Sequence, residues 1–290
     1  MSKLSFFLLA ILSSSLAFVH TPKYANGLVT QLQAALSPGD SVVVIGGTGG
    51  VGQLVTKKLQ AESFPVTVAS RDPSRGRETL GSDVNVVELD LLGSTQAQVE
   101  AILKDAKGLV ISVGTTAFPT AKWKGGNTPK AIDEDAVTKL AQAAASSSSL
   151  KKVILVTSVG VDRTGELPFL ILNLFGVLNA KKAGEQAIMN VAAKGEFEYC
   201  IVRPGRLVGG PFTNLDVARL LQVEGGAENG VEFAKGDDLL GDCKRDACAE
   251  SIVQALLSDE AKNIDFSIIS TEQPALTASD WKLEFQKLQR

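Results

Sequence analysis

Histidine is nearly absent from this chain of 290 residues, and the single one, His20, lies close to the N-terminus. Cysteine is scarce as well: Cys200, Cys243 and Cys248 are odd in number and show no CxxC spacing. Beyond residue 20, these absences exclude a serine-hydrolase triad and a zinc site built on histidine or cysteine, so we expect no metal. They also argue against the disulfide framework of a small secreted domain.

Acidic residues are missing from the first 39 positions, and the apolar run after Lys3 is shorter than a membrane span of about 20 residues. This run and the small residues up to Ala17 are typical of a signal peptide over residues 1–17. Phe18 after the expected cut, followed by an acid-free segment over 18–38, resembles the signal-plus-transit leader of proteins imported into complex plastids of algae. We therefore expect the plastid stroma, with secretion or an uncleaved anchor as the alternatives.

A basic tract is also lacking, since 29 Lys and Arg stand against 32 Asp and Glu and the net charge is −3. This balance argues against a nucleic-acid partner. The chain is 44% apolar and 21% charged. These values suit one soluble domain, which we place at residues 39–290.

What the chain does contain is a glycine-rich turn between an apolar strand and a helix. Residues 41–45, SVVVI, are typical of a strand buried on both faces of a parallel sheet. Gly46, Gly49 and Gly52 follow, and then a segment with one apolar face. Such a turn directs helix N–H groups at an anion and lets a pyrophosphate approach closely. The GxGxxG pattern over residues 47–52, in this context, predicts a dinucleotide site.

The next strand, predicted at residues 65–69, leads to Ser70, Arg71 and Asp72. The residue about 20 positions after the glycines meets the adenosine ribose in such a unit. Arg71 holds this place, and a guanidinium matches the 2′-phosphate of NADP rather than the 2′-hydroxyl of NAD. We predict NADP(H), with NAD(H) less favoured; the alternative is a surface arginine paired with Asp72.

Strands and helices alternate along the rest of the chain. We expect further strands at residues 84–89, 109–113, 153–157, 197–202 and 266–269. This alternation predicts an α/β fold, a doubly wound parallel sheet of the NAD(P)-binding Rossmann type. We also expect a small C-terminal cap on the substrate side that includes residues 212–222.

Ligands bind along the carboxyl edge of such a sheet, so the residues after each strand are the candidates for cofactor binding. Two other segments have two interpretations each. The apolar run over 167–178 is either buried at the core or a dimer seam, or it is a substrate wall or membrane contact. The loop over 117–128 is either a mobile lid or an ordinary surface loop. The candidates for cofactor binding are Gly46, Thr48, Gly49, Gly50, Val51, Gly52, Ser70, Arg71, Asp90, Leu91, Gly114, Thr115, Lys181, Arg203, Pro204 and Gly205.

Five segments, VIGGTGGVG, SRDP, LVTSVGV, NAKKAGEQAI and YCIVRPGRL, resemble the atypical short-chain dehydrogenase/reductases, in particular the NmrA-like and plastid NAD(P)-binding group. The resemblance implies that Ser158 and Lys181 are the catalytic serine and lysine. The family's tyrosine, four residues before the lysine, is Val177 here, which cannot move a proton. Catalysis would then need another acid, such as Lys181 or Lys182. Arg206 stands where the family usually has glycine, and either binds an acidic substrate group or pairs at the surface.

Two functions remain open. The first is an NADP(H)-dependent oxidoreductase that acts on an apolar or carbonyl-bearing plastid metabolite. The second is a non-catalytic NADP(H)-sensing regulator or an assembly factor for photosynthetic complexes. The expected partners are accordingly a small-molecule substrate or a photosynthetic-complex protein, with peripheral thylakoid contact and a monomeric or homodimeric state both open.

Overall fold

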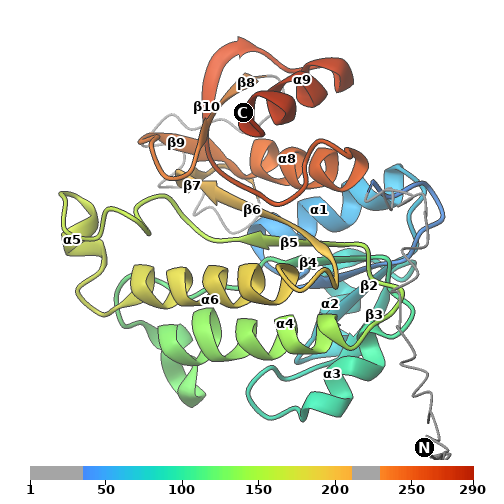
Figure 1. Ribbon diagram of the computed structural model, residues 1–290. Coiled ribbons are helices and arrows are strands. Elements are labelled where there is room, and N and C mark those ends of the chain that lie inside the picture. Colours follow the sequence, from blue (N-terminus) through green and yellow to red (C-terminus); the bar gives the residue numbers. More distant parts are fainter. Residues whose placement is uncertain (1–34, 211–228) are drawn as a thin grey trace, which may run out of the picture. The chain divides into compact units, whose positions relative to one another are not determined.

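An eight-stranded sheet organises the part of the chain that the structure describes (Figure 1). The computed structural model describes residues 35–210 and 229–290. The strand order is β3-β2-β1-β4-β5-β6-β10-β8, and within it only β8 runs antiparallel to its neighbour. The strands are β1 (Val42–Ile45), β2 (Val66–Ser70), β3 (Asn85–Glu88), β4 (Gly108–Ile111), β5 (Lys152–Val156), β6 (Glu198–Pro204), β8 (Asn229–Lys235) and β10 (Ile264–Pro274).

The chain winds outward from the middle of the sheet in both directions. β1 pairs with β2 on one side and with β4 on the other, with Ile45 opposite Ile111. The first three strands continue toward one edge and β4, β5 and β6 toward the other. The connections therefore leave the sheet on opposite sides at β1 and β4, and this switch point is where ligands bind in open α/β sheets.

Helices cover both faces of the sheet (Figure 1). One face packs against α1, α8 and α9, and the other against α3, α4 and α6. Successive residues of β1 point to opposite faces, so Val42 and Val44 enter the first core and Val43 and Ile45 the second. The helices are α1 (Gly50–Ala61), α2 (Pro73–Leu80), α3 (Gln96–Leu103), α4 (Val137–Ala145), α5 (Phe169–Leu172), α6 (Val177–Ala192), α8 (Arg245–Leu257) and α9 (Ala278–Leu288).

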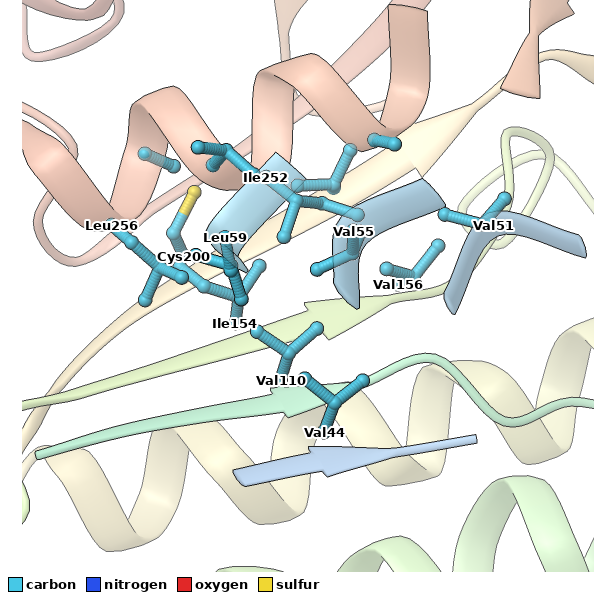
Figure 2. Close-up of a cluster of buried hydrophobic side chains, with 14 of the residues drawn as sticks. Val44, Val51, Val55, Leu59, Val110, Ile154, Val156, Cys200, Ile252 and Leu256 are labelled. Atoms are coloured by element: carbon cyan, nitrogen blue, oxygen red, sulfur yellow. The ribbon is translucent and has the colours of Figure 1, made fainter. Parts of the chain in front are cut away.

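The core between the sheet and the pair α1 and α8 fixes the position of the glycine turn. Burial of one Val, Leu or Ile side chain contributes about 1.5–3 kcal/mol, so the cluster of such side chains in this core anchors α1 firmly behind the turn. Figure 2 shows the side chains that meet there: Val44, Val51, Val55, Leu59, Val110, Ile154, Val156, Cys200, Ile252 and Leu256.

The predicted doubly wound sheet is confirmed, with differences at particular elements. Thr95 caps α3, and it forms a reciprocal capping box with Gln98. The segment after Pro129 starts as a π-helix, η2 (Lys130–Ala136), which continues into α4. A small second sheet of β7 (Arg206–Val208) and β9 (Asp242–Lys244) was not predicted, since strands of three residues leave no readable pattern.

The predicted leader and cap fall largely outside the described residues. Residues 1–34 and 211–228 are not described, so the signal peptide, most of the transit segment and the cap that includes residues 212–222 remain predictions. Leu36 is buried in the core and its N–H donates to the carbonyl of Leu256 at 2.8 Å. The folded unit thus includes residues ahead of position 39. Among the described helices, none has the length and hydropathy to cross a membrane.

Candidate functional site

A cavity of about 1060 Å³ opens at the carboxyl edge of the sheet, where the switch point lies. Residues that follow β1, β2, β3, β4, β5 and β6 all contribute to its wall. Among the predicted site residues, Gly52 and Arg203 do not line it. Those that do are Gly46, Thr48, Gly49, Gly50, Val51, Ser70, Arg71, Asp90, Leu91, Gly114, Thr115, Ser158, Lys181, Pro204 and Gly205.

The glycine turn is packed too tightly for side chains. Gly46 has a φ of +83°, and a Cβ there would lie 2.6 Å from the carbonyl oxygen of Ser112. A Cβ on Gly52 would overlap the carbonyl oxygen of Gly46. Gly52 therefore acts behind the cavity wall, where it lets α1 approach the turn closely enough to present its N-terminus to the cavity.

The N-terminus of α1 is free to receive an anion. Its N-cap residue, Gly49, makes no side-chain cap, and its first turn holds no acidic residue. The first N–H groups of a helix have no partner inside the helix, and the helix dipole favours negative charge at this end. Together with the close-packed glycines, this end of α1 fits a pyrophosphate.

Two arginines mark one end of the cavity. Arg71 and Arg75 both line it and are both exposed. Asp72 caps α2 by accepting from the backbone N–H of Arg75 at 3.0 Å, while Arg71 donates to Oδ1 of Asn127 at 3.2 Å. Arg71 thus faces the cavity rather than pairing with Asp72. Arg75 was not singled out from the sequence; it lies in the first turn of α2, whereas Arg71 precedes this helix.

The other end of the cavity holds Ser158, Thr115 and Lys181. Ser158 donates through Oγ to the carbonyl of Val159 at 3.0 Å. Lys181 Nζ lies 2.5 Å from Oδ1 of Asp133, and Oδ2 of Asp133 accepts from the backbone N–H of Thr115 at 3.1 Å and from its hydroxyl. The lysine that the resemblance singled out is therefore held by a carboxylate.

Asp133 reaches Lys181 because η2 packs closely against α6. A Cβ on Gly184 of α6 would overlap the backbone carbonyl of Asp133. Asp133 was not singled out from the sequence as a site residue. The spacing does indicate that Asp133 is buried, because it lies three and four residues before Ala136 and Val137, which are on the buried side of η2 and α4.

The position of the family's tyrosine is closed to the cavity. Val177 is 3% exposed and packs with Val159, Val161 and Phe169 in a small apolar cluster. Lys182, the other candidate acid, binds Asp162 at 2.6 Å and does not line the cavity. Among the described residues that form the cavity wall, none is tyrosine, histidine or cysteine.

Arg203, expected to bind the cofactor, lies instead in a buried network behind the cavity. Its guanidinium donates to Glu185 at 2.9 and 2.7 Å and lies 2.6 Å from Asp265. Thr157 donates to the same Glu185 carboxylate at 2.6 Å. A guanidinium that is 1% exposed and bound by Glu185 and Asp265 is a structural tie between elements, and its predicted contact with a cofactor has no support in the cavity wall.

Arg206 lies in the cavity wall and pairs at the surface, which is one of the two alternatives that the sequence left open. It donates two hydrogen bonds to Asp242, each of 2.7 Å. The hydrogen bond that Arg206 donates to this carboxylate raises the pKa of the guanidinium. An exposed pair of this kind contributes little stability, so it can open for an acidic ligand group at low cost.

The apolar run over residues 167–178 is not buried as the core interpretation required. Phe169 is buried, but Leu167, Leu170 and Leu174 are 71%, 50% and 66% exposed. Figure 1 shows α5 set apart from the other labelled helices. The loop over 117–128 contacts the same surface, since the Trp123 and Phe175 rings meet edge to face at 6.2 Å.

Comparisons with known proteins agree with this architecture. A model of the family described as NAD(P)H-binding matches residues 46–259. The chain is 29% identical over 219 residues to Protein TIC 62, chloroplastic, of Oryza sativa subsp. japonica, covering 63% of this chain and 42% of that protein. The protein of the same name from Arabidopsis thaliana is 29% identical over 221 residues, covering 63% and 33%. The chain thus spans less than half the length of these relatives.

Solved structures match over most of the chain at low identity. A putative NAD-dependent epimerase/dehydratase from Bacillus halodurans has a TM-score of 0.66 at 18% identity, covering 86% of this chain and all of that one. Yeast methylglyoxal/isovaleraldehyde reductase in complex with NADPH has a TM-score of 0.58 at 15% identity, covering 79% and 78%. At such identities the matches show a shared fold alone, and they confirm the predicted fold class.

Proposed function

Because the chain belongs to the NAD(P)H-binding family, we propose that it is a plastid NADP(H)-binding protein that acts through nucleotide binding, as a sensor or an assembly factor, rather than through turnover. The family match confirms the resemblance to atypical short-chain dehydrogenase/reductases that was drawn from the sequence, and with it the binding of a pyridine nucleotide. The choice of nucleotide, the absence of turnover and the compartment are the proposal.

The preference for NADP(H) is supported by Arg71 and Arg75. Both guanidiniums line the cavity beside Ser70, at the place where the adenosine ribose lies in this fold. Two guanidiniums and a hydroxyl offer charge-assisted hydrogen bonds to a 2′-phosphate. An acidic residue that would accept from the 2′-hydroxyl of NAD is not at this position, because Asp72 is used to cap α2.

The observation that carries the binding role is the buried Val177. Nicotinamide nucleotides supply hydride, and the protein must supply the proton that a reduced carbonyl oxygen needs. At position 177 the chain has a hydrocarbon side chain packed in an apolar cluster. The lysine one turn later is held in an ion pair with Asp133 at 2.5 Å.

A reductase of an apolar or carbonyl-bearing metabolite is the second candidate. It is favoured by Ser158 and Lys181, which line the same end of the cavity. Ser158 can donate a hydrogen bond to a substrate carbonyl, and Lys181 lies close to Thr115, since both bind the carboxylate of Asp133. Lys181 would then have to supply the proton and regain it from solvent.

Localisation in the plastid is supported from two directions. The relatives from Oryza sativa and Arabidopsis thaliana are described as chloroplastic. The first 39 residues of this chain contain no acidic residue and resemble a signal-plus-transit leader. A fluorescent fusion of residues 1–45 should enter the plastid, and a fusion that enters the secretory pathway would contradict this localisation.

A sensor or assembly factor needs a surface for a partner, and the apolar residues around α5 are suited to this role. Four apolar side chains within six residues of one another are about half exposed or more: Leu170, Ile171, Leu174 and Phe175. Contiguous exposed apolar side chains are uncommon on soluble proteins outside binding sites. We assign this surface to a photosynthetic-complex protein, with peripheral contact to the thylakoid as the alternative.

Binding and turnover can be separated in one set of samples. The protein is titrated with NADPH by fluorescence, and NADPH oxidation is then followed with an aliphatic aldehyde, an aromatic ketone and a quinone. We expect saturable binding without oxidation. Oxidation that disappears in Lys181→Ala and persists in Lys194→Ala, an exposed lysine just after α6, would favour the reductase instead.

A further inference from the structure

Asp133 is a buried carboxylate next to the cavity. The proposed binding of a nucleotide does not by itself give this carboxylate a role. Its side chain is 2% exposed, and that of Lys181 is 11% exposed. Every hydrogen bond described for this carboxylate is donated by Lys181 or by Thr115, and both of these residues line the cavity. The carboxylate therefore stands directly behind the cavity wall.

The position of the Lys181 ammonium is closely fixed. The π-helix η2 sets Asp133 in place, and the tight contact at Gly184 holds η2 against α6. On the other side, a Cβ on Gly114 would lie 2.8 Å from Lys181 Nζ, so the ammonium lies close against the backbone at Gly114. The ammonium is thus clamped between Asp133 and the backbone that follows β4, with its remaining N–H donors available to the cavity.

This end of the cavity is the one expected to hold the nicotinamide. The glycine turn receives the pyrophosphate and the two arginines mark the adenosine end, so the remaining half of a dinucleotide extends toward Thr115, Ser158 and Lys181. An unpaired ammonium there would repel the positively charged ring of the oxidised nucleotide and leave the neutral ring of the reduced one unaffected. Asp133 cancels that charge.

We propose that Asp133 is a positioning residue that fixes Lys181 and balances its charge, and so sets the relative affinity of the site for oxidised and reduced nucleotide. This inference rests on the proposed binding of NADP(H). It gives a sensor what it needs, since the ratio of the two dissociation constants decides which redox state of the pool occupies the site. The phosphates of both nucleotides are the same, so the ratio isolates the ring.

The two members of the pair make predictions of opposite sign. Asp133→Asn keeps the shape and leaves an uncompensated cation, so the ratio Kd(NADP⁺)/Kd(NADPH) should rise. Lys181→Met leaves an uncompensated anion, so the ratio should fall. We expect a change of at least about tenfold in each direction, because at an effective dielectric constant of about 20 a unit charge would have to lie about 12 Å from the ring for its effect to be as small as tenfold.

The experiment measures both dissociation constants by calorimetry on the full chain. The matched controls are Asp135→Asn and Lys130→Met, which split an exposed ion pair of 2.8 Å in the same part of the chain and should leave the ratio unchanged. Thermal melts verify that each variant is folded. If Asp133→Asn does not fold, Lys181→Met and the double variant Asp133→Asn/Lys181→Met still test the inference. The double variant removes both charges, so its ratio of dissociation constants should be close to that of the wild type.

Opposite shifts in the two single variants support the inference. Shifts of the same sign, or no shift in either variant while the wild type binds both nucleotides, would show that Asp133 is only structural and would overturn it. A wild-type protein that binds neither nucleotide would overturn the proposed function and this inference together.

Discussion

At the residue scale, the proposed selectivity for NADP(H) rests on Arg71 and Arg75. We expect Arg71→Ala and Arg75→Ala each to weaken NADPH binding by about 10- to 100-fold, because each removes a charge-assisted hydrogen bond worth about 1.5–3 kcal/mol. The affinity for NADH, which has no 2′-phosphate, should change little. Arg77→Ala is the control on the same helix, since Arg77 is exposed and lies outside the cavity wall. Equal losses for NADH and NADPH would contradict the assignment.

Gly52 gives a second prediction at this scale. A Cβ on Gly52 would overlap the carbonyl of Gly46, so Gly52→Ala must push α1 away from the turn. We expect a loss of stability of about 1–3 kcal/mol and a loss of nucleotide binding. Gly165→Ala, at an exposed glycine with open space around it, is the matched control. Urea unfolding and NADPH titration measure both effects, and unchanged binding in Gly52→Ala would refute the role of the turn.

At the scale of elements, a buried ionic network ties β5, β6, β10 and α6 together. Arg203 binds Glu185 and Asp265, and Thr157 also donates to Glu185. Glu185→Ala leaves a buried guanidinium without its main partner, so we expect a loss of about 3–5 kcal/mol in the free energy of unfolding. Glu134→Ala, which removes an exposed pair with Lys130, should cost less than about 1 kcal/mol. Similar losses in both variants would argue against the network as a structural tie.

The elements also show how far the sequence predicts this protein. β1, α1 and the turn between them follow from local signals: β-branched residues, glycine spacing and one apolar helix face, each confirmed within a residue or two. Local signals do not predict the ion pairs of Arg203 and Asp133, because the partner of each lies 18 or more residues away and only the tertiary packing brings them together. The exposure of α5 is another such case, since an apolar run predicts burial unless something outside the chain covers it.

At the scale of the whole molecule, the core holds thiols that folding keeps protonated. Burial raises the pKa of Cys200 from 9.0 to about 12, and Figure 2 shows this side chain among the apolar groups below α8. A pKa raised by folding means that the native state holds the proton longer than the unfolded state. The associated stability is fully present below pH 9 and is lost as the pH rises from about 9 to 12.

We therefore expect the free energy of unfolding to fall by up to about 1.4 kcal/mol per pH unit through this range on account of Cys200 alone. Urea unfolding at several pH values measures the slope, and Cys200→Ala should reduce it. A slope that is the same in the variant and the wild type would contradict the assignment of this pH dependence to Cys200.

The proposed function of the whole molecule depends on one property, that the cavity at the switch point binds NADP(H). The most direct measurement is isothermal titration calorimetry of the full chain with NADPH and, in parallel, with NADH. The glycine turn, the free end of α1 and the two arginines predict one saturable NADPH site per chain, with NADPH bound at least about tenfold more tightly than NADH. Equal affinities would contradict the role of the arginines, and no saturable binding of either nucleotide would contradict the central claim.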